Sequence, residues 1–145
     1  YGQPVLSPTD GEVVAVVDGL PESQPKIETD AENPVGNHVV IKVDENEYLY
    51  IAHMQPNSIL VSLGDTVTVG QQIGLCGNSG NTSEPHIHIH LQTTLEIFTY
   101  DDHGNINGFA KDARGLPLRF HNYLANGELV EIGMPIGGQF IQNAP

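Results

Sequence analysis

Glycine and proline interrupt this chain so often that no long helix can form between them. The 145 residues include 16 glycines and 10 prolines, and valine and isoleucine gather in the short stretches that remain. β-Branched residues favour strands, whereas glycine and proline are typical of the turns that join strands. The pattern therefore predicts a mainly β protein, and a length of 145 residues indicates one domain.

Short apolar or alternating stretches bounded by turn residues define the expected strands. A turn at 44–46 is expected to join two of them into a hairpin. The segment 19–34 is acidic and rich in proline and is expected to be a long loop, and 100–115 is irregular and is expected to be an exposed insertion. The predicted strands cover residues 13–17, 38–43, 47–53, 58–61, 73–76 and 86–93, followed by a last strand region at 116–124.

The charge balance excludes one large class of partner. Lysine and arginine together number 5 against 18 aspartates and glutamates, which gives a formal net charge of −13. Such a chain repels the phosphates of nucleic acids and the surface of anionic membranes. No apolar run approaches the roughly 20 residues that cross a bilayer, so no membrane insertion is expected.

Three histidines occupy alternate positions in one predicted strand. His86, His88 and His90 are each separated by an isoleucine. Because strand side chains alternate between faces, these three imidazoles are expected on the same side. A hydrophobic core has no use for such a group, so the motif indicates a metal site or a site of proton transfer.

The remaining histidines and the cysteine have simpler interpretations. His90 is expected to hydrogen-bond near the site rather than to ligate a metal. His38 is expected at the rim or in a structural role, His103 in a solvated turn, and His121 near a sheet edge without a partner. Cys76 has no cationic neighbour in sequence and is interpreted as a small buried apolar residue.

The order of several motifs resembles a known family, the lysostaphin/LytM-type zinc endopeptidases of metallopeptidase family twenty-three. The resemblance covers roughly the first ninety residues, and a Pro-x-x-Phe ending at 115–120 is similar to one subgroup. Its five segments are residues 1–14, 36–41, 51–54, 64–74 and 77–88.

The resemblance implies a single domain built on an antiparallel sheet of sandwich-like or barrel-like character. It also implies a groove, walled by residues 19–34 and 100–115, that carries a zinc site. The second histidine of the family's His-x-His strand is a zinc ligand, and it corresponds to His88. The first histidine corresponds to His86, and His53 matches the histidine that ends an earlier strand; these two are expected to activate the water and stabilise the oxyanion. Zinc chemistry agrees, because three protein ligands and one open position lower the pKa of a bound water to about 7.

Two further zinc ligands of the family are expected in a His-x-x-x-Asp segment upstream of the motif that matches residues 1–5. This chain begins at that motif, so residues 1–145 are interpreted as one peptidase domain truncated at its N-terminus. Two alternatives stay open: another residue replaces the ligands, or the chain is a degenerate member that no longer holds the metal.

The resulting hypothesis is a zinc-dependent endopeptidase that cleaves the peptides of bacterial peptidoglycan, with one Zn²⁺ and an extracytoplasmic location implied by that substrate. A non-catalytic cell-wall-binding or regulatory module of the same fold is the first alternative. A phosphotransfer or carrier domain of related β architecture is the second, although fold analogy supports function only weakly. Neither Lys26 nor Lys42 lies at the hairpin tip that a carrier domain would need.

Overall fold

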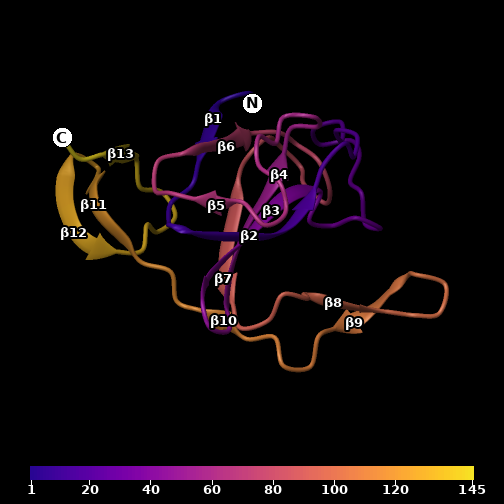
Figure 1. Ribbon diagram of the computed structural model, residues 1–145. Helices are drawn as coiled ribbons and strands as arrows, with labels where there is room; N and C mark the ends of the chain where they lie inside the picture. The colour runs from indigo at the N-terminus through magenta and orange to yellow at the C-terminus, as the bar shows by residue number, and fades with distance from the viewer.

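The computed structural model describes all 145 residues, and it consists of strands, turns and loops without a helix. Since there is no helix, none is long and apolar enough to cross a membrane. The prediction of a mainly β, antiparallel fold is confirmed. The strands (Figure 1) are β1 (Pro4–Leu6), β2 (Gly11–Val17), β3 (Asn37–Asp44), β4 (Glu47–Met54), β5 (Thr66–Val67), β6 (Gln72–Leu75), β7 (His88–Gln92), β8 (Phe98–Tyr100), β9 (Ile106–Phe109), β10 (Gly115–Leu116), β11 (Phe120–Ala125), β12 (Glu128–Gly133) and β13 (Ile141–Asn143).

The largest sheet has six strands and lies at the centre of the structure (Figure 1). Its order is β10-β7-β4-β3-β2-β5, all neighbours are antiparallel, and its two outer strands leave it open rather than closed on itself. One face supplies the core, because the inward residues of β3 and β4 are almost fully buried and apolar. These core residues include Val39, Ile41, Leu49 and Ile51, with Val13, Val67 and Ile73 from the surrounding strands.

The opposite face of the same sheet, here named the polar face, carries histidine and tyrosine rings beside the buried side chains of Val40 and Ala52. In register, Tyr50 of β4 pairs with His90 of β7, and Ala52 pairs with His88. Alternation along β7 therefore places Ile89 and Leu91 against the core and turns the histidines away from it. An antiparallel sheet commonly packs one face on the core, and its other face is more polar.

The span 100–115, expected to be irregular, contains a hairpin instead. β8 and β9 pair with each other, and the rings of Phe98 and Phe109 contact at a centroid distance of 5.4 Å. The hairpin extends away from the central sheet at the right of Figure 1. Asp101 follows β8 and accepts hydrogen bonds from the backbone of His103 and Asn105, so His103 lies in an exposed turn as expected.

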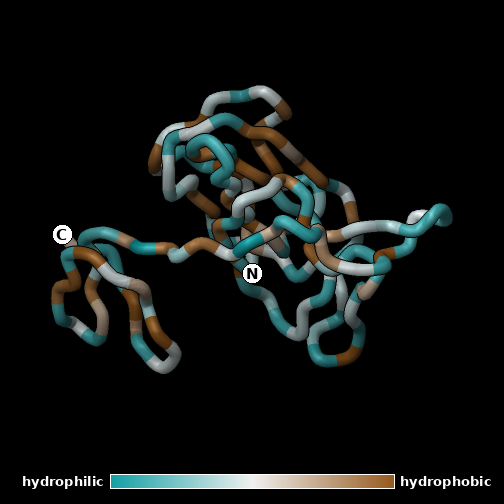
Figure 2. Tube along the Cα trace, turned by 90° about the horizontal axis from the view of Figure 1, so that it is seen from below, coloured by the Kyte–Doolittle hydropathy of each residue, from teal (hydrophilic) through white to brown (hydrophobic).

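The C-terminal residues form a separate three-stranded sheet with the order β12-β11-β13. It lies beside the central body and is joined to it by the segment before β11 (Figures 1 and 2). Several large apolar side chains on it are exposed, and its small interior holds Tyr123 and Ala125. Sequence motifs did not predict this sheet, because nothing beyond residue 124 resembles a family segment.

Other boundaries need correction. The predicted strand at 58–61 is wrong: this segment is coil, although the Leu60 amide donates to the Ile73 carbonyl. The predicted strand 86–93 begins two residues later, at His88, and ends at Gln92. The region 116–124 divides into β10 and β11, because Pro117 cannot donate the backbone hydrogen bond that a continuous strand needs. The hairpin turn at 44–46 and the long loop at 19–34 are confirmed.

Candidate functional site

A stack of three rings lies on the polar face of the sheet. His90 stacks on Tyr50 at a centroid distance of 4.8 Å and an angle of 8°, and His38 stacks on the same tyrosine at 5.8 Å. The Nδ1–H of His38 donates to the Gly36 carbonyl at 2.7 Å. These rings come from β3, β4 and β7, so neighbouring strands alone bring them together.

His53 reaches this face only through a break in strand geometry. Leu49 and Ile51 point into the core, and regular alternation would send His53 the same way. In the register of the two strands, however, Asn37 of β3 pairs with Met54 of β4, and Val39 pairs with Ile51. One residue of β3 therefore lies opposite two residues of β4, which is a β-bulge. His53 also has a left-handed φ of 63°. Such a bulge turns a side chain to the other face, where the His53 ring lies beside other histidines.

The loop that follows β6 holds His53 in place. The Ser79 carbonyl accepts from His53 Nδ1 at 2.8 Å, and the Ser79 hydroxyl donates to the Met54 carbonyl. Buried Asn37 donates from its amide to the carbonyls of Leu20 and Met54. Ser79 and Asn37 are fully buried, so this polar network is shielded from water and fixes the position of the loop.

The structure brings His53, His86 and His88 together. The His53 ring centroid is 4.8 Å from that of His86 and 5.9 Å from that of His88. His53 is buried, whereas His86 and His88 are exposed to solvent. Rings from the end of β4, from the loop before β7 and from β7 itself thus form one cluster that is open on one side.

Hydrogen bonds to backbone carbonyls set the tautomers of two of these rings. His53 Nδ1 faces the Ser79 carbonyl and His86 Nδ1 faces the Glu84 carbonyl at 2.8 Å. A carbonyl oxygen only accepts, so each Nδ1 carries the proton. In the neutral rings, Nε2 therefore keeps its lone pair and can accept a proton or bind a metal.

Two rings of this cluster, those of His53 and His88, have a lowered pKa. Desolvation lowers the pKa of His53 below the ordinary histidine value, and the neighbouring His86 and His88 lower it further, although the hydrogen bond to Ser79 opposes this. Desolvation also lowers the pKa of His88, with His86 as a smaller cause. Both rings are therefore unprotonated near neutral pH, the form needed for a base or a ligand.

The donors suit zinc, but they make an incomplete ligand set. Neutral imidazole nitrogen is a preferred zinc donor. No group of three or more histidine, cysteine, aspartate or glutamate side chains is arranged to hold a metal ion in this structure. His88 and its neighbours thus match a zinc site by chemistry and fall short of one by ligand number.

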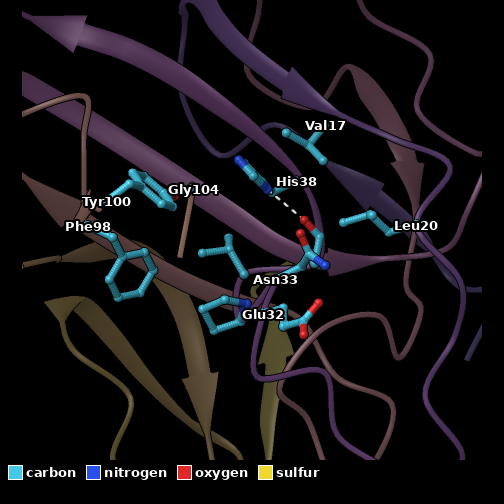
Figure 3. A pocket seen from close by; sticks show the side chains of 11 residues that line it. Val17, Leu20, Glu32, Asn33, His38, Phe98, Tyr100 and Gly104 are labelled. Carbon is cyan, nitrogen blue, oxygen red and sulfur yellow. Dashed lines mark hydrogen bonds between the residues drawn. The ribbon is translucent and has the colours of Figure 1, made fainter. Parts of the chain in front are cut away.

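A groove runs from the histidines along the polar face. Three adjoining cavities of about 280, 210 and 220 Å³ share Val35 and Phe98 in their linings. The first is lined by His53, His88 and His90, and the last reaches Tyr100. Figure 3 shows this far end, where Glu32 and Asn33 of the long loop face Phe98 and Tyr100 across the groove. The expected walls are confirmed in outline, although only the first part of the 100–115 segment contributes.

Tyr50 joins the floor of the groove to its hairpin wall. Its hydroxyl donates to the Leu95 carbonyl at the base of the hairpin, and burial, together with the nearby Glu96 and Tyr100, raises its pKa to about 12. Replacing Tyr50 by phenylalanine keeps the ring stack but leaves that carbonyl without this donor. We expect Tyr50→Phe to lower the free energy of unfolding by about 1–2 kcal/mol, measured by urea denaturation. Unchanged stability, together with unchanged hydrogen exchange in β8, would contradict this role.

His38 makes a prediction about pH. Burial lowers its pKa more than the hydrogen bond to Gly36 raises it. The unfolded chain therefore binds a proton at His38 more readily than the folded protein does. The contribution of neutral His38 to the free energy of unfolding is fully present above about pH 6.5, and it is lost as the pH falls through the lowered pKa of the folded state. We expect His38→Phe, which keeps an aromatic ring beside Tyr50, to lose less stability than wild type between about pH 8 and about pH 5.5. Urea unfolding of metal-free protein measures both losses, and equal losses would refute the assignment.

Sequence patterns missed several residues of the site. Ser79, Tyr50 and Gln92 contact the histidines or position them, yet none stands in a chemically distinctive motif. Gln92 carried a positional signal, because it lies at even spacing from His88 and His90 in the same strand. Tyr50 carried none, because it lies an odd number of residues from His53. Cys76, expected to be a small buried apolar residue, is half-buried and packs against the core, and its backbone pairs with that of Met54.

Comparison with known proteins adds an independent line of evidence. The family model described as Peptidase family M23 matches residues 1–100. Peptidoglycan DD-endopeptidase ShyA of Vibrio cholerae is 43% identical over 56 residues, which are 39% of this chain and 13% of that protein. This chain therefore spans only a small part of the length of that curated relative.

Two solved structures are similar in fold. One is the catalytic domain of a mutant of the prophage-encoded M23 protein EnpA from Enterococcus faecalis, with 26% identity, a TM-score of 0.51, and coverage of 74% of this chain and 67% of that chain. The other is the catalytic domain of the antimicrobial peptidase lysostaphin from Staphylococcus simulans, with 21% identity, a TM-score of 0.50, and coverage of 79% and 67%. At 21% identity the second likeness concerns the fold alone.

Proposed function

Because this chain belongs to peptidase family M23, we propose that it is the histidine-bearing part of a zinc-dependent endopeptidase that cleaves the peptides of bacterial peptidoglycan. The observation that carries the proposal is the convergence of His53, His86 and His88 at one end of a groove. The relative ShyA is a peptidoglycan DD-endopeptidase, which supports this substrate class. A cell-wall substrate also implies an extracytoplasmic location.

The groove suits a peptide in an extended conformation. It is open and runs along the polar face between the loop residues 32–36 and β8. Val35, Phe98 and Tyr100 offer apolar contact area, and Asn33 offers an amide. Apolar contact area combined with a few well-placed polar groups is typical of a ligand-binding site.

The roles of the three histidines follow from their free nitrogens. Hydrolysis adds water across the peptide C–N bond: the hydroxyl joins the carbonyl carbon, and a proton must reach the leaving nitrogen. Nε2 of His53 or His86 takes a proton from the attacking water and returns one to the departing amine. His88 is proposed as a zinc ligand, and the bound zinc would polarise the carbonyl and acidify the water.

This version requires two ligands beyond His88, which the family resemblance expects in a His-x-x-x-Asp segment. The alternative is a non-catalytic module of the same fold that binds cell-wall peptides without metal. Residues 1–145 form no three-ligand group by themselves, so the zinc version depends on the two expected ligands. The proposal that residues 1–145 make one peptidase domain also extends beyond the family match at residues 1–100.

Zinc content and chelation separate the two versions. We expect the complete protein to contain about one Zn²⁺ per molecule and to lose cleavage of peptidoglycan peptides after chelation, with recovery on adding Zn²⁺. Elemental analysis and release of new amino groups measure these results. A protein that retains no zinc, and that binds cell-wall fragments equally well with and without chelator, would instead be the non-catalytic module.

A further inference from the structure

Three side chains at alternate positions of β7 form one hydrogen-bonded row on the polar face. His88 Nε2 lies 2.9 Å from His90 Nδ1, and His90 Nε2 lies 3.2 Å from Gln92 Oε1. The amide nitrogen of Gln92 donates to the carbonyls of Thr94 and Glu96 at 2.8 and 3.2 Å. The row thus runs from backbone carbonyls to a ring of the proposed site.

The direction of donation along this row can be assigned, because the donor and acceptor atoms of Gln92 are unambiguous. Gln92 is buried, and its amide nitrogen faces two carbonyl oxygens, which can only accept. Its Oε1 must then be the atom that faces His90, so His90 Nε2 carries a proton and donates it. In a neutral ring His90 Nδ1 is consequently an acceptor. His88 Nε2 must donate to it, which leaves the lone pair of His88 on Nδ1.

We propose that Gln92 and His90 are positioning residues that fix the tautomer and the ring orientation of His88, so that Nδ1 is its open nitrogen. His90 is itself held by its stack on Tyr50. The tautomer is a property of the metal-free protein. Its effect on the affinity for Zn²⁺ rests on the proposed function. Hydrogen-bond partners of this kind set which nitrogen of a histidine can bind a metal.

The tautomer is directly observable. In metal-free protein labelled with ¹⁵N-histidine, at about pH 8 where ordinary imidazoles are neutral, long-range ¹H–¹⁵N correlation distinguishes protonated from unprotonated ring nitrogens. We expect His88 to show a protonated Nε2 and an unprotonated Nδ1, and His90 to show the same form. A proton on Nδ1 of His88 would overturn the proposal without any variant being made.

Two variants at position 90 test whether the row causes this form. His90→Phe keeps a ring on Tyr50 but has no acceptor, whereas His90→Gln restores an acceptor oxygen. In the His90→Phe variant we expect His88 to be a mixture of its two tautomers. The Kd of this variant for Zn²⁺ should be about 10–100-fold higher than that of the wild type. His90→Gln should recover most of both properties. His121→Phe, at an exposed position on β11, is the matched control and should change neither.

The readouts separate this inference from the proposed function. Wild-type His88 in the expected form, without measurable Zn²⁺ binding, would refute the zinc enzyme and support the hydrogen-bonded row. Zinc binding with His90→Phe indistinguishable from wild type in tautomer and Kd would support the enzyme and refute the role of His90.

Discussion

Replacing His88 by alanine is expected to remove cleavage almost entirely. As the proposed zinc ligand in this chain, it helps to supply several kcal/mol of stabilisation to the transition state, which corresponds to a loss in kcat/KM on the order of 10³-fold or more. Because the side chain is exposed and outside the core, we expect the free energy of unfolding of the metal-free protein to change little. Steady-state cleavage assays and urea unfolding measure the two quantities.

His121→Ala is the matched control for this substitution. It removes the same side chain from an exposed strand position in the C-terminal sheet, so both activity and zinc content should stay at the wild-type level. If His88→Ala retains activity within a few fold of His121→Ala, His88 has no catalytic or metal-binding role. The cluster of three rings would then need another explanation.

Replacing Gly36 by alanine is expected to have the largest effect on stability among substitutions near the site. Gly36 has a left-handed φ of 64°, and an added Cβ would lie 2.3 Å from the Ser79 carbonyl oxygen. That oxygen is the atom that holds His53 Nδ1. Backbone strain and overpacking together should lower the free energy of unfolding by about 3 kcal/mol, as measured by urea denaturation, and activity should fall because His53 is displaced.

Gly64→Ala provides the control for backbone strain alone. Gly64 has a φ of 88°, but nothing lies within 4 Å of an added Cβ. We expect this variant to lose only about 1–2 kcal/mol and to keep its activity. If the two variants are equally destabilised, the close approach of Gly36 to the loop at Ser79 contributes nothing.

The fold class and part of the site follow from local patterns. Alternation is a property of each strand by itself, so the shared face of His88 and His90 could be predicted without knowing their neighbours. Two features lay beyond such patterns. The coil at 58–61 has the composition of a strand, but it makes only isolated hydrogen bonds. The C-terminal sheet carried no recognisable motif.

His53 shows most clearly where local rules stop. Its even spacing from Leu49 and Ile51 predicts a core position, and the family resemblance alone pointed to the site. The extra residue in β4 reverses that orientation, and a bulge depends on the register of two strands rather than on one.

Local patterns were enough to predict a mainly β protein with a histidine-rich strand, because strand propensity, turn chemistry and alternation act over a few residues. Tertiary structure alone decided that His53 joins His86 and His88, that the Ser79 and Glu84 carbonyls hold the protons on the Nδ1 atoms of His53 and His86, and that Gln92 orients His90. Those contacts join side chains to backbone groups whose positions depend on how separate segments pack, and no spacing along the chain encodes such distances.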